Sequence, residues 1–139
     1  MSRRNIALAT TLAGALTALL ATIGLKNRRN RIRVFRPLEN DPVFIQSAGH
    51  SSYVALDVKC QIPRDYEFEP TEDEERMIAM AARQTIEILK DDIADSFEIG
   101  GKLKHHVAER ANGEIRRKLV DLNPDRRLIF SADIRQIAA

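Results

Sequence analysis

The sequence predicts an α+β protein, in which an N-terminal single transmembrane helix precedes a small antiparallel sheet packed against two consecutive amphipathic helices. Three observations support this prediction. Residues 6–25 carry no charged side chain. Residues 53–62 alternate strictly between the two faces of a strand, with apolar side chains on one of them. Residues 71–99 and 102–122 repeat apolar side chains at helical spacing.

The uncharged segment is long enough to cross a bilayer, because a helix rises about 1.5 Å per residue and the hydrocarbon core is about 30 Å thick. Arg3 and Arg4 precede it, and Lys26 follows Leu25 directly. A removable signal peptide is the alternative. Its apolar core is usually only about 7–15 residues long and is followed by a small-x-small cleavage site, which is absent after Leu25. We therefore expect a retained anchor.

Small side chains recur every fourth residue along the predicted anchor, at Thr10, Gly14, Ala18 and Thr22. Such a stripe allows close packing of helices in lipid. It predicts a helix partner, either a second copy of this chain or another integral membrane protein. An alanine-rich anchor without a partner is the alternative.

Charge divides the chain into a membrane anchor (1–26), a basic juxtamembrane linker (27–42) and a soluble α+β domain (43–139). Residues 1–36 hold eight basic residues and no acidic one, whereas the remainder holds 14 basic and 20 acidic residues. The basic residues after the anchor predict a collar that contacts anionic lipid headgroups: Lys26, Arg28, Arg29, Arg31 and Arg33. An acidic domain without tryptophan does not favour nucleic acid as a partner.

The flanking charges leave the orientation of the soluble domain open. Basic residues are more numerous after the anchor than before it, which favours a cytoplasmic domain by the positive-inside rule. Arg3 and Arg4 before a mildly apolar segment resemble a twin-arginine export signal, which favours a periplasmic domain. An acid-free, arginine-rich N-terminus also suits a mitochondrial inner-membrane protein.

The soluble domain reads as β-(β)-β-α-α-β, with short strands at 31–34 and 43–45 and long strands at 53–62 and 128–137. The two long strands are expected to pair antiparallel, with both helices on one side of the sheet. Thr71 and Glu74 form a capping box that begins the first helix. Gly100 and Gly101 separate it from the second helix.

No catalytic, cofactor-binding or metal site is predicted. Adjacent side chains on a helix point about 100° apart, so His105 and His106 are expected to be solvated rather than to share a metal. The acidic residues Asp91, Asp92 and Asp95 lack the spacing of a calcium loop, and a solvated edge is expected there. No spacing supports a Ser47–His50–Asp57 triad. Cys60 lies on the apolar strand face, where a buried thiol is expected.

The order of elements resembles the FliL family of flagellar basal-body-associated proteins. The resemblance begins at Ser52-Tyr53-Val54-Ala55-Leu56-Asp57-Val58, continues through the two helices parted near 97–102, and ends in residues 128–136, Leu-Ile-Phe-Ser-Ala-Asp-Ile-Arg-Gln. It implies a single-pass inner-membrane protein with a periplasmic, stomatin-like domain. Two features depart from the family: the basic flank after the anchor, and the absence of a long low-complexity linker.

The resemblance implies a non-enzymatic accessory protein that assembles around the flagellar stator and supports torque generation. Independently of it, the predicted anchor and the lack of convergent catalytic residues favour a membrane-anchored scaffold that forms homo-oligomers. The alternative is an accessory subunit of another inner-membrane complex, bacterial or mitochondrial. A third class is a small membrane-tethered enzyme.

Overall fold

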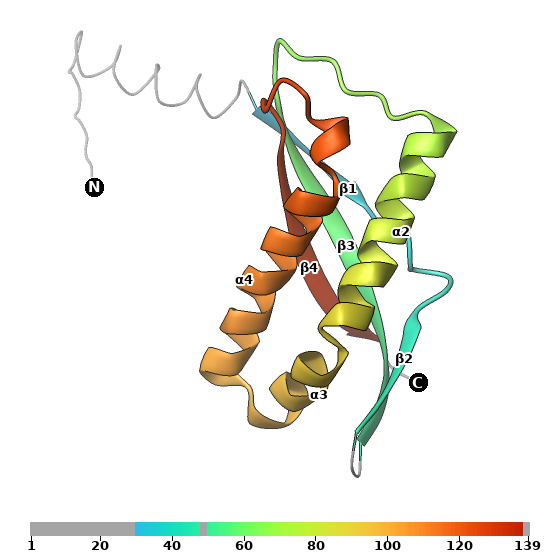
Figure 1. Cartoon of the computed structure of the whole chain (residues 1–139), viewed down its shortest axis with the longest axis vertical. Coiled ribbons are helices and arrows are strands. Elements are labelled where there is room, and N and C mark those ends of the chain that lie inside the picture. Colours follow the sequence, from blue (N-terminus) through green and yellow to red (C-terminus); the bar gives the residue numbers. More distant parts are fainter. Residues whose placement is uncertain (1–29, 48–49, 138–139) are drawn as a thin grey trace, which may run out of the picture. The chain divides into compact units, whose positions relative to one another are not determined.

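The computed structural model describes residues 30–47 and 50–137 of the 139-residue chain (Figure 1), and side chains at 47 and 50 are excepted. Two compact units divide the chain, one of residues 1–31 and 63–67, the other of residues 32–62 and 68–139. The second unit contains the helices and nearly all of the sheet. The predicted anchor (6–25) and its small-residue stripe lie outside the described residues. No helix within the described residues is long and apolar enough to cross a membrane.

The sheet is built around β3 (His50–Pro63), which has neighbours along both edges. One edge pairs antiparallel with β4 (Ile129–Ile137), from Tyr53↔Ile137 to Gln61↔Ile129. The other edge is shared by β1 (Asn30–Phe35) and β2 (Val43–Ser47), and β2 pairs antiparallel with β3. The predicted antiparallel pairing of the two long strands is therefore confirmed, and β1 brings part of the predicted linker into the sheet.

Three α-helices follow β3, rather than the two that were predicted: α2 (Glu72–Ile88), α3 (Lys90–Ile99) and α4 (Gly101–Lys118). The expectation of one uninterrupted helix over 71–99 is wrong, because Leu89 leaves the helical conformation with φ −99° and ψ 12°. Leu89 is buried at this break, while Asp91 and Asp92 occupy the first turn of α3, where the helix dipole favours acidic groups.

The ends of the helices follow the predicted signals. Thr71 and Glu74 form the expected capping box at the start of α2. Gly100 and Gly101 separate α3 from α4 with φ of 69° and 58°, a conformation that side chains disfavour. A short 3-10 helix, η1 (Val120–Leu122), then leads toward β4.

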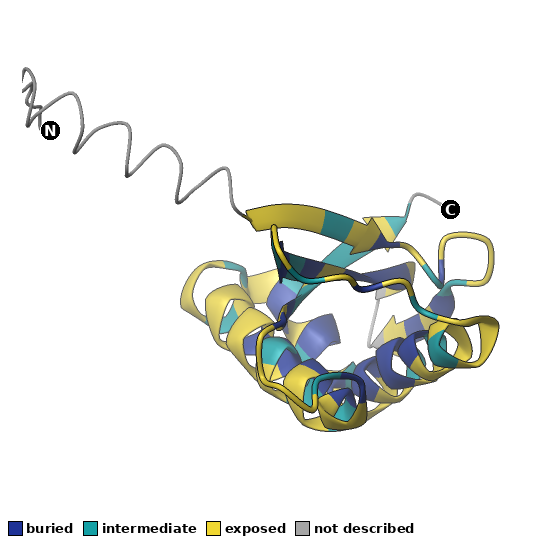
Figure 2. Ribbon diagram, turned by 90° about the horizontal axis from the view of Figure 1, so that it is seen from above, coloured by how far each residue is buried: buried dark blue, intermediate teal, exposed yellow. Residues whose placement is uncertain are grey.

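The core lies between the helices and one face of the sheet (Figure 2). The predicted apolar face of β3 is buried throughout: Val54, Leu56, Val58, Cys60 and Ile62. The helices and the residues that directly follow them contribute buried side chains from the predicted stripes: Ile78, Ile86, Leu89, Ile93, Val107, Ile115 and Leu119. Phe68, in the connection before α2, packs edge-on against the rings of Phe35 and Phe130, with centroids 6.4 and 6.1 Å away.

Side chains of α4 cover part of the free edge of β4. Asn112 Oδ1 accepts a hydrogen bond from the Ala132 backbone N–H at 2.7 Å. The guanidinium Nε of Arg116 donates to the Phe130 carbonyl oxygen, also at 2.7 Å. Both contacts occupy backbone groups that a foreign strand would otherwise use for pairing, which is a known protection of edge strands.

Candidate functional site

The sheet has one face that no described helix covers, because the helices all lie on the opposite side (Figure 2). Alternation along the strands fixes which side chains point outward. The outward set includes Ile32 and Val34 of β1, Phe44 of β2, Tyr53 and Asp57 of β3, and Ile129 and Arg135 of β4. We call it the uncovered sheet face.

Apolar side chains are concentrated on this face. Ten large apolar side chains are exposed among the described residues, and five of them belong to it: Ile32, Val34, Phe44, Tyr53 and Ile129. Phe44 and Tyr53 lie directly opposite each other on β2 and β3, with their ring centroids 5.2 Å apart. Exposed aromatic and aliphatic side chains on one uncovered face mark it as a candidate interaction surface.

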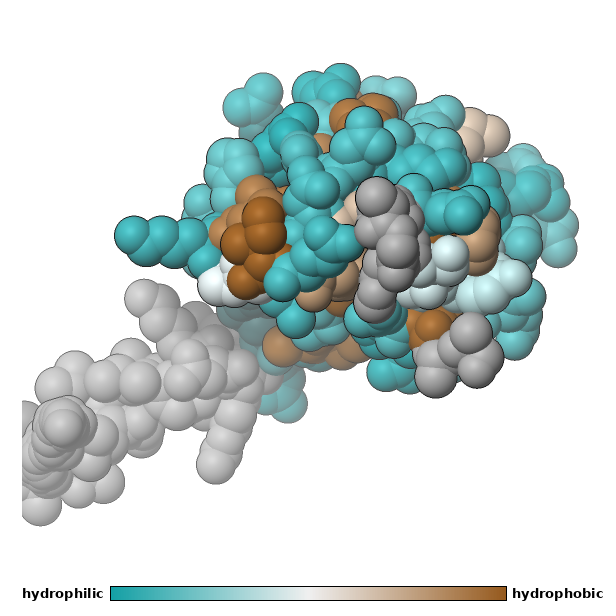
Figure 3. All heavy atoms as spheres, turned by 90° about the horizontal axis from the view of Figure 1, so that it is seen from below, coloured by the Kyte–Doolittle hydropathy of each residue, from teal (hydrophilic) through white to brown (hydrophobic). Residues whose placement is uncertain are grey.

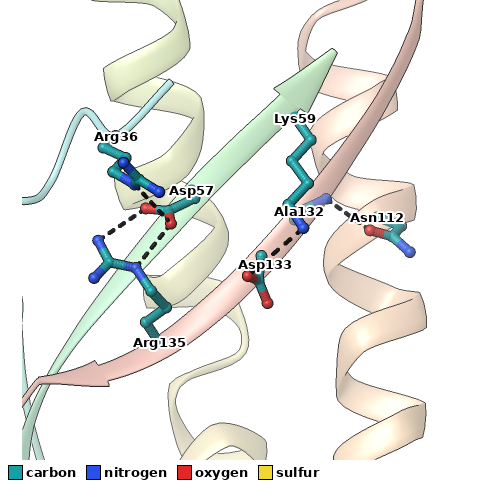
Figure 4. A network of polar contacts seen from close by, with 7 residues as sticks. All are labelled: Arg36, Asp57, Lys59, Asn112, Ala132, Asp133 and Arg135. Carbon is teal, nitrogen blue, oxygen red and sulfur yellow. Dashed lines mark hydrogen bonds and ion pairs between the residues drawn. The ribbon is translucent and has the colours of Figure 1, made fainter. Parts of the chain in front are cut away.

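A charged cluster occupies the middle of the face (Figure 4). The carboxylate of Asp57 accepts two hydrogen bonds from Arg135, from Nε at 2.8 Å and from a terminal nitrogen at 3.0 Å. Arg36, which follows β1, adds a longer ion pair of 3.6 Å. The Asp57 residue is only 3% exposed, although both arginines reach solvent. Two guanidinium groups from flanking segments therefore compensate a single buried carboxylate.

The geometry of this cluster makes it rigid. A two-point contact between a guanidinium and a carboxylate fixes both planes, which a single lysine contact does not do. The hydrogen bond to Asp57 raises the pKa of Arg135 above its ordinary value, so Arg135 stays protonated at any physiological pH. Lys59 and Asp133 form a looser pair of 3.9 Å beside the cluster, with both side chains about half exposed.

The described part of the predicted lipid collar makes contacts within the protein. Arg31 is exposed and donates to the Tyr66 carbonyl oxygen at 3.3 Å. Arg33 pairs with Glu69 at 3.2 Å and lies over the Phe35 ring, 4.9 Å from its centroid. Lys26, Arg28 and Arg29, like Thr10, Gly14, Ala18 and Thr22, lie outside the described residues.

The histidines of α4 and the acidic residues of α3 do not form a shared metal site. His105 and His106 are exposed as predicted, and His105 Nε2 lies 3.5 Å from a Glu109 carboxylate oxygen. Asp92 pairs with Arg110, while Asp91 and Asp95 are exposed. No group of three His, Cys, Asp or Glu residues within residues 30–47 and 50–137 is arranged to hold a metal ion.

Cys60 is buried, as predicted, on the inner face of β3. Burial raises the pKa of its thiol to about 11, so the sulfur stays protonated near neutral pH. Because the thiolate is the reactive form of cysteine, Cys60 is a packing residue and not a nucleophile.

A hollow of about 480 Å³ lies between β1 and α2. Its walls include Arg33, Arg36, Glu72 and Arg76, and its floor includes Phe35 and Ile78. Arg33, Arg36 and Arg76 each pair with an acidic side chain of the protein. None of the ten residues that line it is a histidine, cysteine, serine or threonine.

The Asp57–Arg135 contact was not predictable from the sequence alone. Asp57 and Arg135 were each expected on the polar side of their strand, but the register that brings them together was unknown. Asp57 lies opposite Asp133, and Arg135 lies opposite Ala55, so the pair is diagonal.

The side that Figure 3 shows has separate hydrophobic patches among mainly hydrophilic residues. No protein-family model, curated protein or solved structure matches this chain.

Proposed function

We propose that this chain is a non-enzymatic accessory protein that is anchored in a membrane by residues 6–25 and binds an integral membrane protein complex through the uncovered sheet face. One observation supports the proposal above all others. The buried Asp57 carboxylate, held by Arg36 and Arg135, lies in the middle of a face with five exposed large apolar side chains.

This composition suits recognition better than catalysis. Apolar side chains supply the area that association removes from water, and aromatic residues such as Phe44 and Tyr53 are enriched at interfaces. A fixed charge cluster contributes mainly to specificity, because a partner must present matching groups at one position. Arg36 and Arg135 retain exposed parts that a partner carboxylate can reach.

The resemblance to the FliL family gives this proposal its specific form, a stator-associated protein of the bacterial inner membrane with a periplasmic domain. The alternative is an accessory subunit of a different inner-membrane complex, bacterial or mitochondrial. A topology reporter fused after Ala139 distinguishes a periplasmic soluble domain from a cytoplasmic one. A periplasmic signal supports the FliL-like form, and a cytoplasmic signal excludes it.

Photo-crosslinking from the full chain in its native membranes tests the binding face. A photoreactive amino acid replaces Phe44 in one variant and Met80 in a control variant. Met80 is the more exposed of the two, at 61% against 44%, but it belongs to α2 and not to the sheet. We expect a discrete crosslink to an integral membrane protein from position 44 and none from position 80. Equal crosslinking at both positions, or none at 44, would contradict the proposal.

A further inference from the structure

The two edges of the sheet differ in how their backbone groups are covered. At the β4 edge, Asn112 and Arg116 of α4 bond to the backbone of the strand. At the opposite edge, β3 is the only strand that pairs with β1 among residues 30–47 and 50–137. The arginines of α2 bond elsewhere, Arg76 to the first turn of its own helix and Arg83 to Asp41. The β1 edge therefore lacks the cover that α4 gives to β4.

The register of the sheet shows which backbone groups of β1 face this open edge. Because the Ala132 N–H bonds to Asn112, Ala132 directs its backbone away from β3, and its partner Val58 directs its own toward β1 and β2. β1 runs opposite to β3 (Figure 1), and residues that lie opposite each other share a face. Phe35 is buried on the inner face, like Val58, so Phe35 bonds to β3. Val34, the residue before it, directs its N–H and its carbonyl oxygen to the open edge.

The hollow between β1 and α2 lies directly beside this open edge. Val34 is among the residues that line it, although the Val34 side chain belongs to the uncovered sheet face. Phe35 and Ile78, which are both buried, form an apolar floor, and the small side chain of Ala79 lies on the wall that α2 provides. Its volume of about 480 Å³ is within the range of about 300–1,000 Å³ that is usual for ligand pockets. The hollow therefore has room for side chains of a segment that lies along Val34.

The charges around the hollow favour a basic occupant. Its lining contains three arginines and two glutamates. Each arginine pairs with acidic side chains of the protein, in the pairs Arg33–Glu69, Arg36–Asp57, Arg76–Glu72 and Arg76–Asp73. Glu75, the second glutamate of the lining, is exposed and has no ion pair with any of the residues that the structure describes. Five carboxylates thus surround three guanidinium groups, which leaves an excess of two negative charges that a lysine or arginine would complement.

We propose that β1 and α2 bind an extended segment of the partner protein, which adds to the sheet as a further strand beside β1. Its backbone bonds to the N–H and the carbonyl oxygen of Val34. An apolar side chain of the segment enters the hollow over Phe35 and Ile78, and a lysine or arginine pairs with Glu75. Strand addition of this kind takes its affinity from main-chain hydrogen bonds and its specificity from pockets for alternate side chains. The inference rests on the proposed function, because it names the part of the integral membrane partner that this chain recognises.

Photo-crosslinking of the full chain in its native membranes tests the added strand. A photoreactive leucine analogue replaces Ala79, which lines the hollow, and replaces Met80 in the control, because Met80 follows it on α2 but does not line the hollow. The variant with the photoreactive residue at position 44 reports on the uncovered sheet face in the same membranes. We expect position 79 to crosslink to the same integral membrane protein as position 44, and position 80 to give no crosslink. Mass spectrometry of the product at 79 should identify a segment with both apolar and basic side chains.

Two pairs of variants separate the backbone contact from the charge contact. Val34→Pro removes the N–H that faces the open edge, a position where an edge strand tolerates proline. Val34→Ala shortens the same side chain but keeps the N–H, so the crosslink at 79 should be about fivefold or more weaker in Val34→Pro than in Val34→Ala. Glu75→Lys should weaken the crosslink at 79 about threefold. Glu98→Lys is its control, since Glu98 is exposed on α3 and does not line the hollow, and it should leave the crosslink unchanged.

The outcomes distinguish the added strand from the proposed function. A crosslink at 44 with none at 79, or equal crosslinks at 79 in Val34→Pro and Val34→Ala, would overturn the added strand alone. A crosslinked segment without basic side chains would overturn it as well. If Val34→Pro loses the crosslinks at both positions, Glu75→Lys decides, and an unchanged crosslink at 79 in that variant would overturn the added strand. The absence of crosslinks from both 44 and 79 in the parent background would contradict the proposed function too.

Discussion

At the residue scale, Asp57 is the one charged side chain that is fully buried among the described residues. A carboxylate in such a place is tolerated only when charged donors compensate it. Arg135 meets this need with two short hydrogen bonds, whereas Arg36 contributes one longer and more exposed contact. The two arginines are therefore unequal in their expected contribution to stability.

Replacement of Arg135 should destabilise the fold more than replacement of Arg36. Arg135→Met leaves the Asp57 carboxylate without its two closest donors, with an expected loss of about 1–3 kcal/mol in the free energy of unfolding. Arg36→Met is the matched control and should cost at most about 1 kcal/mol, as exposed pairs do. Urea titration of the full chain in detergent micelles measures both, and an equal loss would argue against the assigned geometry.

The thiol of Cys60 gives a pH dependence with a definite sign. Its pKa is about 11 in the folded protein, against 9.0 when exposed, so the unfolded chain loses this proton first. The contribution of this thiol to the free energy of unfolding is fully present below pH 9. It declines as the pH rises toward 11, by up to about 2–3 kcal/mol. Cys60→Ala should show a shallower decline than the parent in urea titrations between pH 8 and about 10. Parallel curves would show that burial does not perturb the thiol.

At the element scale, the break between α2 and α3 was the feature that periodicity missed. Ile86, Leu89 and Ile93 keep helical spacing across it, and all three are buried, so the apolar pattern alone indicates one helix. Changing the helix axis at Leu89 lets both segments bury their stripes. The sequence does carry a signal for a new helix start, the pair Asp91 and Asp92, but acidic pairs on helix surfaces are common.

The sequence predicts the long strands and their pairing better than it predicts the register between them. Strict alternation identified the buried face of β3 and its pairing with β4, because one face must lie against the helices. The register was not determined by the pattern, so the Asp57–Arg135 contact and the edge contacts of Asn112 and Arg116 emerged only with the structure. These contacts depend on positions 78, 20 and 14 residues apart in the chain.

Leu89→Ala tests whether the break between the helices is a core site. The Leu89 side chain is buried, and its truncation should cost about 2–5 kcal/mol because a cavity remains. The neighbouring Ile88 is 52% exposed, so Ile88→Ala is the control and should cost well under half as much. Urea titration of both variants in the full chain decides between a buried and an exposed Leu89. A loss below about 0.5 kcal/mol for Leu89→Ala would place it outside the core.

At the scale of the whole molecule, the domain combines a protected edge with an unprotected face. Asn112 and Arg116 occupy backbone groups of β4, which opposes indiscriminate strand pairing. The uncovered sheet face has no such cover from the described helices. A protein confined to a membrane plane meets its neighbours at raised effective concentration, so weak contacts at such a face can add up.

Self-association is expected to depend on the small-residue stripe of the anchor. Gly14→Leu places a large side chain in the middle of that stripe and should reduce crosslinked dimers and larger species in membranes. Raising the salt concentration should weaken contacts between exposed charges but leave helix packing intact. Crosslinking of parent and variant at low and high salt separates the two contributions. A parent chain that stays monomeric under every condition would exclude the expected homo-oligomer.

Extraction of native membranes with alkaline carbonate tests whether residues 6–25 hold this protein in a membrane, as we propose. We expect the full chain to stay in the membrane pellet, because an apolar helix of about 30 Å and not the basic collar would retain it. Gly14→Arg/Ala18→Arg, which places two charges mid-segment, should release it into the supernatant. Release of the parent chain by carbonate, or by high salt alone, would contradict the claim.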